Sequence, residues 1–339
     1  MENEQSYSLE QNTNDQPSAE QPVYPPKPAA EEKKGNVWIR SLTSLALYLA
    51  VGYYFFGGNM IPLLIITGIV IFHELGHFIA MKIYNYQDLG IFFIPLLGAY
   101  ASGTKREVSQ KQSAVILLAG PLPGIIVGLA LYIFNNYRDP NSFFDNNIIS
   151  WASVFLIVLN VLNLLPIYPL DGGQLLNRLF LDESRIISRI FVLISALGIA
   201  YFAIKLGDTH RAFYMLLFLP VMLLFRLRTD TKFEKLTKLV EQKGINLEKT
   251  YDEITDEEYW KIRNILIENN YPTVRHINPA PPYQYSSGED RVVTTIEGLL
   301  QRTIIQDLNW GGKILIIVIW AAAFASPFLI ELEFPFFRF

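Results

Sequence analysis

The sequence MIPLLIITGIVIFHELGHFIAMKIY, residues 60–84, is a long apolar run with His73, Glu74 and His77 in its second half. About 20 predominantly apolar residues are enough for a helix to cross a hydrocarbon core of about 30 Å. An ionisable side chain inside such a helix costs about 2.5 kcal/mol or more unless it is paired, binds a metal or faces a wet cavity. The stretch therefore predicts a transmembrane helix that carries a functional site.

The rest of the chain also has the composition of a membrane protein. Of its 339 residues, 51% are hydrophobic and 18% are charged. Because such long apolar runs are rare in soluble cores, we predict an all-α polytopic membrane protein with about seven transmembrane helices, one of them broken by prolines. The apolar segments cover residues 38–56, 60–84, 113–135, 148–170, 186–204, 212–225 and 312–330.

One apolar segment, residues 86–103, is too short and interrupted to span a membrane. It contains Gly90, Pro95 and Gly98, and we interpret it as a re-entrant, β-like element. Irregular backbone is tolerated at membrane depth only where it is buried in protein or lines a wet cavity. A cavity is therefore expected close to this element.

Charge and composition divide the chain into four parts. Lys and Arg flank alternate apolar segments, which places the N-terminus in the cytoplasm and the C-terminus outside in a multi-pass protein of the cell (inner) membrane. Acids outnumber bases in the first and third parts, and no basic patch indicates nucleic-acid binding. The predicted parts are a disordered cytoplasmic tail at 1–35, a transmembrane domain at 36–229 with its core at 60–180, a small helical cytoplasmic domain at 230–309, and a last transmembrane helix with a short outer tail at 310–339.

Two helices are expected inside the segment 230–309. Thr255 followed by Glu258 predicts a capping box before the sequence YWKIRNILI. The sequence RVVTTIEGLLQRTIIQDLNW, residues 291–310, is amphipathic, and we expect it to lie against the membrane surface.

The pattern His73-Glu74-Leu75-Gly76-His77 is typical of a metal site on a helix. At about 100° per residue, the two imidazoles project from nearly the same side of the helix, one turn apart, and can reach one ion. Glu74 lies beside them and can deprotonate a metal-bound water. The alternative is that these side chains are only satisfied by neighbouring helices.

A tetrahedral zinc site needs a third protein ligand, and the chain has no cysteine. His210 and His276 fall outside the expected membrane depth, whereas Asp171 follows the helix 148–170 at the depth of His73. Asp-Gly-Gly is also a common turn sequence, so Asp171 could have only a local role. Asn163 could bind across helices, or its amide could donate to a substrate carbonyl or to the oxyanion formed from it.

The pair of motifs, H-E-x-x-H at residues 73–77 and N-x-x-P-x-x-x-x-D-G at residues 163–172, resembles those of the site-2 protease family of intramembrane zinc metalloproteases. The resemblance covers roughly residues 60–180. It implies Zn²⁺ held by His73, His77 and Asp171, with Glu74 as general base and acid and Asn163 orienting the substrate carbonyl. The sequence GPLPG at residues 120–124 is similar to the family's third core helix, and residues 90–101 to its membrane-embedded strand.

The resemblance implies a zinc metalloendopeptidase that hydrolyses peptide bonds within or next to the transmembrane segments of protein substrates in the lipid bilayer. The alternative is a membrane metal-binding or transport protein that uses the same His/Asp site without proteolysis. A structural zinc site is more often closed by four protein ligands, and the sequence offers three candidates. The substrate's identity and the oligomeric state stay open.

Overall fold

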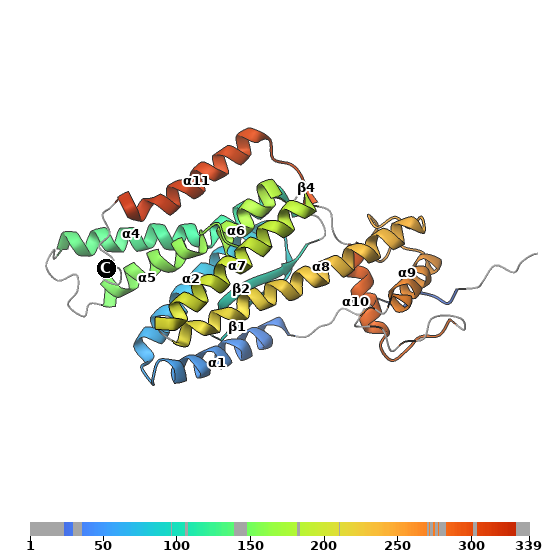
Figure 1. The fold of residues 1–339 in the computed structure, drawn as a ribbon, viewed down its shortest axis with the longest axis horizontal. Coiled ribbons are helices and arrows are strands. Elements are labelled where there is room, and N and C mark those ends of the chain that lie inside the picture. The colour runs from blue at the N-terminus through green and yellow to red at the C-terminus, as the bar shows by residue number, and fades with distance from the viewer. Residues whose placement is uncertain are drawn as a thin grey trace, which may run out of the picture.

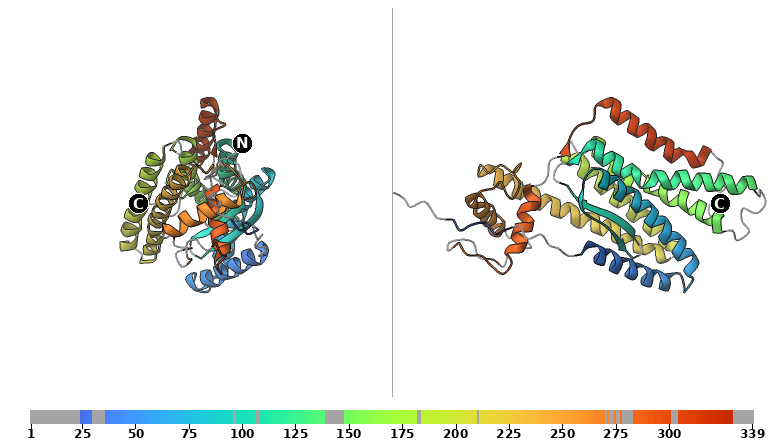
Figure 2. Two further views of the ribbon diagram at one scale, coloured as in Figure 1. Left: turned by 90° about the vertical axis from the view of Figure 1, so that its right-hand side faces the viewer. Right: turned by 180° about the vertical axis from the view of Figure 1, so that it is seen from behind.

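The computed structural model shows an elongated, mostly helical protein, with α9 and α10 at one end of a larger helical bundle (Figure 1). Two further views show the same arrangement from the side and from behind (Figure 2). The structure describes residues 24–29, 36–95, 97–105, 108–138, 148–181, 184–209, 211–269, 271, 274, 277, 283–300 and 304–329.

The bundle begins with two helices and a β-hairpin. Helices α1 (Val37–Phe55) and α2 (Met60–Ile83) are each capped by an asparagine side chain. The segment expected to be β-like forms β1 (Gln87–Ile94) and β2 (Gly98–Thr104), which pair antiparallel. The outer edge of β1 lies against α1, where Ser44 Oγ accepts a hydrogen bond from the backbone N–H of Phe93 at 3.1 Å.

The apolar segment 113–135 folds as two helices rather than one. Strand β3 (Val108–Ser109) leads into α3 (Gln110–Ala119), and after Gly120 the chain continues as α4 (Pro121–Arg138). Ser109 caps α3, and Pro121 occupies the first position of α4, where a missing backbone N–H costs nothing. The resulting break places Gly120 at the junction of the two helices.

The segment 148–170 is helical only in its first part. Helix α5 (Ile148–Asn163) ends before Pro166, and an irregular turn leads to the short helix α6 (Asp171–Leu176) and the π-helical turn η1 (Asn177–Leu181). Helix α7 (Arg185–Thr209), the 3₁₀ turn η2 (Arg211–Leu217) and α8 (Phe218–Gln242) follow. Helix α8 continues well past the predicted end at residue 225, and its last turns leave the bundle (Figure 1).

The C-terminal half of α8 packs with α9 (Asp256–Glu268) and α10 (Glu289–Leu300) around one apolar core that includes Leu236, Tyr259 and Ile296. We call these three parts the α8–α10 unit. The predicted capping box of Thr255 and Glu258 is confirmed at the start of α9. Strand β4 (Ile304–Ile305) then pairs parallel with β3, and α11 (Trp310–Leu329) packs back on the bundle.

The expectation that residues 291–310 lie against the membrane is wrong for α10. Its apolar face, which includes Val292, Ile296 and Leu299, is buried in the core of the α8–α10 unit. An amphipathic pattern requires only an apolar partner, and here α8 and α9 supply it.

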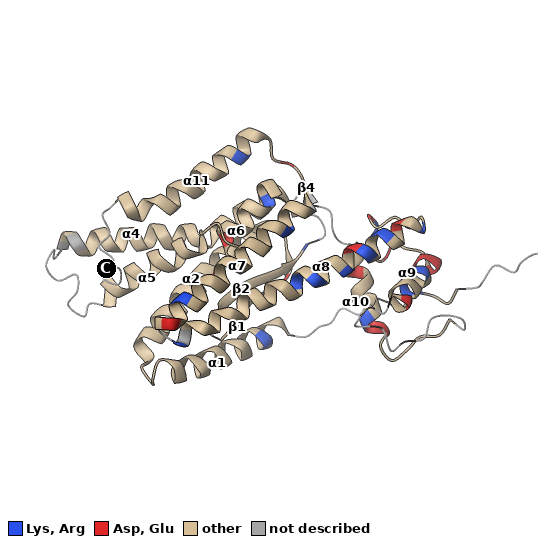
Figure 3. Ribbon diagram, in the orientation of Figure 1, with Lys and Arg blue, Asp and Glu red and all other residues tan. Residues whose placement is uncertain are grey.

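Among the described residues, four helical stretches are long and apolar enough to cross a membrane: Met60–Ile83, Gln110–Asn135, Ile186–Thr209 and Trp310–Leu329. Large apolar side chains such as Ile194 and Leu197 of α7 are more than half exposed, as expected of a surface that faces lipid. Charged residues are few on these helices and gather on the α8–α10 unit (Figure 3). The chain is thus built as an integral membrane protein, while the number of seven spans stays a prediction.

The α8–α10 unit contains a buried ion pair. Arg263 Nε donates to Glu289 Oε1 at 2.6 Å, and Tyr259 Oη donates to the same oxygen at 2.6 Å. The two charged side chains are only 2% and 9% exposed. Burial opposes the charge of Glu289, but the hydrogen bonds from Arg263, Tyr259 and Ser286 outweigh it and lower the pKa of Glu289.

We predict that Glu289→Gln destabilises the α8–α10 unit by about 3–5 kcal/mol, because the substitution leaves the Arg263 charge buried without its carboxylate partner. The loss is measured by tryptophan fluorescence during thermal unfolding at pH 7, in a protein whose other four tryptophans are replaced by phenylalanine so that Trp260 alone reports. Because the folded-state pKa of Glu289 is lowered, its contribution is present above the unfolded value of about 4.3 and is lost as the pH falls below it. The difference between wild type and variant should therefore shrink with acidification.

A matched control is Glu257→Gln, which removes one partner of the exposed Glu257–Lys261 pair on the same helix. Exposed pairs contribute little, so this variant should unfold close to wild type. Equal losses for the two variants would contradict a stabilising role of the buried pair.

Candidate metal centre

His73 and His77 lie on one face of α2, as their spacing predicts. Their Nε2 atoms are 3.1 Å apart, and the rings meet edge to face. Both residues are buried, with 6% and 7% of their surface exposed. Two imidazole nitrogens therefore point at the same place inside the bundle.

Asp171 completes the group from another part of the chain. Its Oδ2 lies 3.0 Å from His73 Nε2 and 3.3 Å from His77 Nε2. The residue is the first of α6, and Gly172 and Gly173 let the turn after α5 fold tightly against it. A Cβ on Gly172 would lie 2.0 Å from the Leu164 carbonyl oxygen, and one on Gly173 would lie 2.3 Å from the Ile167 carbonyl carbon.

Each histidine is oriented through its other nitrogen. His73 Nδ1 is 2.7 Å from Asn160 Oδ1, and His77 Nδ1 is 2.7 Å from the backbone oxygen of Ile116. Asn160 uses its NH₂ group to donate to the Leu156 oxygen at 2.7 Å, which turns its carbonyl oxygen toward His73. Because both partners are acceptors, each neutral imidazole carries its proton on Nδ1 and directs a lone pair from Nε2 toward Asp171.

These three atoms fit a tetrahedral metal ion. Ligands that bind zinc at about 2.0–2.1 Å in a tetrahedron lie about 3.3–3.4 Å from one another, close to the distances found here. Asp171 Oδ2 is buried and lacks a hydrogen-bond donor among the described residues, so it meets two lone pairs rather than two N–H groups. Three mutually repelling acceptors are stable together when a cation lies between them. His73, His77 and Asp171 form the one such buried group of His, Asp and Glu in the described part of the chain.

Glu74 follows His73 on α2 and is also buried, with 6% exposed. Its Oε2 accepts a hydrogen bond from the backbone N–H of Ala101 in β2 at 2.7 Å. The β-hairpin therefore fixes the orientation of the carboxylate and brings the outer edge of β2 next to it.

Small residues allow the helices to approach this closely. A Cβ on Gly76 would lie 1.9 Å from the Ala119 oxygen, and a Cβ on Gly120 would lie 2.3 Å from His77 Nε2. On α4, a Cβ on Gly124 would lie 2.1 Å from Asn160 Nδ2. The GPLPG sequence thus leaves room for one ligand and for the residue that orients the other.

The structure brings together four of the five predicted site residues and leaves out Asn163. Asn163 is half-buried at the end of α5, and the hydrogen bonds of the described residues do not connect it to His73 or Asp171. Asn160, one turn earlier, makes the contact with His73, and sequence analysis missed it. The sequence signal that could have identified Asn160 is a second asparagine three residues before Asn163, on the same face of the apolar helix α5. His210 and His276 lie outside the described residues.

Comparison with known proteins matches residues 61–144 to the model of peptidase family M50. The chain is 29% identical to stage IV sporulation protein FB of Bacillus subtilis over 123 residues, which cover 36% of this chain and 41% of that protein. It is 32% identical to a zinc metalloprotease of Methanocaldococcus jannaschii over 113 residues, 32% of this chain and 31% of that protein. Over residues 61–144 the chain is thus similar to peptidase family M50. These matches span less than half of either relative.

Among solved structures, the site-2 protease from Methanocaldococcus jannaschii aligns with a TM-score of 0.41 and 22% identity. The alignment covers 54% of this chain and 85% of that structure. The family model covers His73, Glu74 and His77, whereas Asp171 lies beyond the matched residues. The placement of the aspartate beside the histidines therefore comes from the geometry of this chain.

We predict that Asn160→Ala lowers zinc affinity about 10–100-fold, because His73 loses the acceptor that fixes its tautomer and ring orientation. Zinc affinity can be measured by competition with a chromophoric chelator on the purified protein in detergent. Asn163→Ala is the matched control and should bind zinc as wild type does. An unchanged affinity in the Asn160 variant would rule out this positioning role.

We also predict that Gly120→Ala loses most of its bound zinc, since the new methyl group overlaps His77 Nε2. The control is Gly198→Ala on α7, where a Cβ would meet no atom within 4 Å. That substitution raises helix propensity and should leave the metal content unchanged. Metal analysis of both purified variants, with thermal unfolding as a check on folding, distinguishes a local clash from global unfolding.

Proposed function

We propose that this chain is an intramembrane zinc metalloprotease that cleaves peptide bonds within or next to transmembrane segments of other proteins. The observation that carries the proposal is the convergence of three lone-pair donors, His73, His77 and Asp171, beside the buried carboxylate of Glu74. The match of residues 61–144 to peptidase family M50 supports a protease, and the named zinc metalloprotease among the relatives supports zinc as the metal.

The residues divide the chemistry among themselves. His73, His77 and Asp171 would hold the ion and leave a fourth position for solvent. The zinc ion, when bound, would supply a Lewis acid that lowers the pKa of water and polarises the substrate carbonyl. Glu74 would accept the proton of the attacking water and later return it to the leaving amine. Its hydrogen bond to Ala101 holds Oε2, and among the described residues no hydrogen bond engages Oε1.

The hairpin gives the substrate a place to bind. A helical peptide hides its backbone in its own hydrogen bonds, so the scissile segment has to be extended before hydrolysis. Of the two outer edges of the hairpin, that of β1 is covered by α1, whereas that of β2 lies next to Glu74. We propose that an unwound substrate adds to this edge of β2 as a strand. We also propose that the substrate is cut toward the cytoplasmic side of the membrane, because the positive-inside pattern places that end of α2 in the cytoplasm.

Glu74 argues against a transport or purely metal-binding role. Such a protein needs no buried carboxylate beside the ligands, and a structural site is usually closed by a fourth protein ligand. Among the described residues, the group holds three ligands. An open position next to a held carboxylate is the arrangement that hydrolysis requires.

We predict that Glu74→Gln retains zinc but lowers the rate of cleavage of a transmembrane peptide by at least about 10²-fold, since the proton acceptor is lost. The glutamine side chain has the same size and its oxygen can still accept the N–H of Ala101. Gel analysis of a labelled transmembrane substrate in detergent measures the rate, and a chelator should abolish the wild-type activity.

Cleavage by the zinc-loaded Glu74→Gln protein at the wild-type rate would refute the proposed role. A wild-type protein that binds zinc and cleaves neither an intact nor a shortened transmembrane peptide would favour the metal-binding alternative. Faster cleavage of the shortened peptide would instead indicate an enzyme that acts on remnants of earlier proteolysis.

A further inference from the structure

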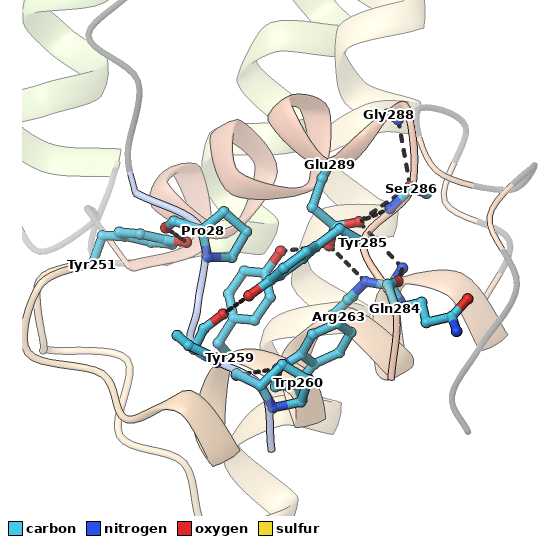
Figure 4. A network of polar contacts seen from close by, with 12 residues as sticks. Pro28, Tyr251, Tyr259, Trp260, Arg263, Gln284, Tyr285, Ser286, Gly288 and Glu289 are labelled. Carbon is cyan, nitrogen blue, oxygen red and sulfur yellow. Dashed lines mark hydrogen bonds and ion pairs between the residues drawn. The ribbon is translucent and has the colours of Figure 1, made fainter. Parts of the chain in front are cut away.

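Six residues of the N-terminal tail, Tyr24–Ala29, are packed against the α8–α10 unit, although the sequence predicts disorder for residues 1–35. The segment reads Tyr-Pro-Pro-Lys-Pro-Ala. It reaches a surface more than 220 residues away in sequence, made by the loop before α9, by α9 itself and by the residues before α10 (Figure 4). The rest of the tail lies outside the described residues.

The sequence of the segment restricts its backbone before it binds. Pro25, Pro26 and Pro28 have a fixed φ near −65°, and each residue before a proline favours an extended conformation. Such a peptide is close to a polyproline II helix, which has no internal hydrogen bonds and exposes its carbonyls. Little conformational entropy is therefore lost when it docks.

Aromatic side chains of this surface donate hydrogen bonds to the exposed carbonyls of the segment. Trp260 Nε1 donates to the Pro25 oxygen at 2.8 Å, and Tyr251 Oη donates to the Pro28 oxygen at 2.8 Å. Tyr285 Oη donates to the oxygen of Pro26, between them. Figure 4 shows these aromatic side chains gathered around the docked segment.

Lys27 makes the contacts that select a sequence. Its Nζ donates to the backbone oxygens of Tyr251, Asp252 and Ile254 at 2.6, 2.9 and 2.6 Å, so all three N–H bonds of the ammonium group have acceptors. Its backbone N–H, which the prolines around it lack, donates to Asp256 Oδ1 at 2.7 Å. The ammonium group also lies 5.2 Å from the centre of the Tyr251 ring, within range of a cation–π interaction.

Tyr24 adds an aromatic contact at the start of the segment. Its ring centre lies 5.0 Å from that of Tyr283, which packs in turn against Trp260. Aromatic pockets that bind extended proline peptides are a recurrent mode of peptide recognition. The α8–α10 unit has the same features, with a lysine pocket added.

We propose that the loop before α9, together with Trp260, Tyr283 and Tyr285, is a binding site for peptides of the type Tyr-Pro-Pro-Lys-Pro, and that the chain's own tail occupies it as a releasable latch. The tail adds only the partly buried Tyr24 to the apolar core of the unit, whose buried residues come from α8, α9, α10 and the chain between them. Release therefore leaves that core in place. The proposal does not depend on proteolysis.

The latch limits where the unit can lie. Seven residues separate Ala29 from Val37, the first residue of α1, and a fully extended chain over these eight Cα–Cα steps reaches about 28 Å. A docked tail therefore holds the α8–α10 unit within that distance of α1. Release of the tail removes this restraint and leaves α8 and the chain between β4 and α10 as the covalent connections.

The test uses the full-length protein in detergent with residues 24–29 replaced by a Gly/Ser sequence of equal length, which opens the site. The probe is a fluorescein-labelled peptide of residues 20–34, followed by fluorescence anisotropy. We expect saturable binding to the opened protein and at least about 10-fold weaker apparent binding to wild type, because the tethered tail competes at an effective concentration near millimolar. The absence of binding to an opened protein with an unchanged thermal unfolding profile overturns the proposal, as does equal binding to both proteins.

Lys27 supplies the specificity control. A peptide with Lys27→Met keeps the side-chain stem and loses the three hydrogen bonds to carbonyls, so it should bind at least about 10-fold more weakly. A peptide with Lys33→Met loses the same charge and should bind as the parent does. Equal binding of the two substituted peptides would show a non-specific electrostatic contact and overturn the proposal.

A second measurement avoids the opened protein. The chain has no cysteine, so Ala29→Cys gives one site for a nitroxide spin label at an exposed position. Adding Lys27→Met should convert an immobilised spectrum to a mobile one, whereas adding Lys33→Met should leave it immobilised. Identical spectra in the two double variants would overturn the latch.

Discussion

Three electron-pair donors from two separate segments share one buried volume, and much of the bundle follows from that constraint. His73, His77 and Asp171 approach one another to 3.0–3.3 Å in an apolar body, where unpaired polar groups are expensive. Each surrounding feature removes one obstacle. The break after Asn163 brings the chain back beside the histidines, and Gly172 and Gly173 allow the tight turn. Asn160 and the Ile116 carbonyl accept the Nδ1 protons of the two histidines, so that both Nε2 atoms are free of protons and face Asp171.

The need to orient Glu74 beside the three electron-pair donors explains why the hairpin is part of the bundle. A carboxylate beside a metal site has to be oriented without being neutralised by a cation of its own. A backbone N–H does this, and a strand offers such groups at its edge. Ala101 of β2 supplies one to Glu74, while α1 covers the opposite edge of the hairpin through Ser44. The strand that lies nearest the carboxylate is therefore the one that we propose pairs with an extended peptide.

The sequence predicted which side chains would lie together at the candidate site because these side chains are few and two of them are close in sequence. The spacing of His73 and His77 fixes their relation on any helix, and the absence of cysteine left Asp171 as the candidate for a third ligand. Asn160 escaped prediction because its role depends on which face of α5 meets α2, which is tertiary information. The break at Gly120 and the length of α8 were missed for the same reason. For α10, periodicity identified an apolar face but could not distinguish a membrane surface from α8 and α9 as its partner.

The docking of the tail could not be predicted because amino-acid composition shows only that a segment does not fold by itself. Residues 24–29 have too little apolar surface to fold, yet their prolines make them a low-entropy ligand once a surface offers donors for their carbonyls. Communication between two regions requires an element with two arrangements. A latch that binds and releases Tyr24–Ala29 is such an element, and it is joined through α1 to β1, whose partner strand holds Glu74. The covalent link from the tail to α1, together with the contacts of α1 with β1 and of β2 with Glu74, connects the unit at one end of the molecule to the carboxylate.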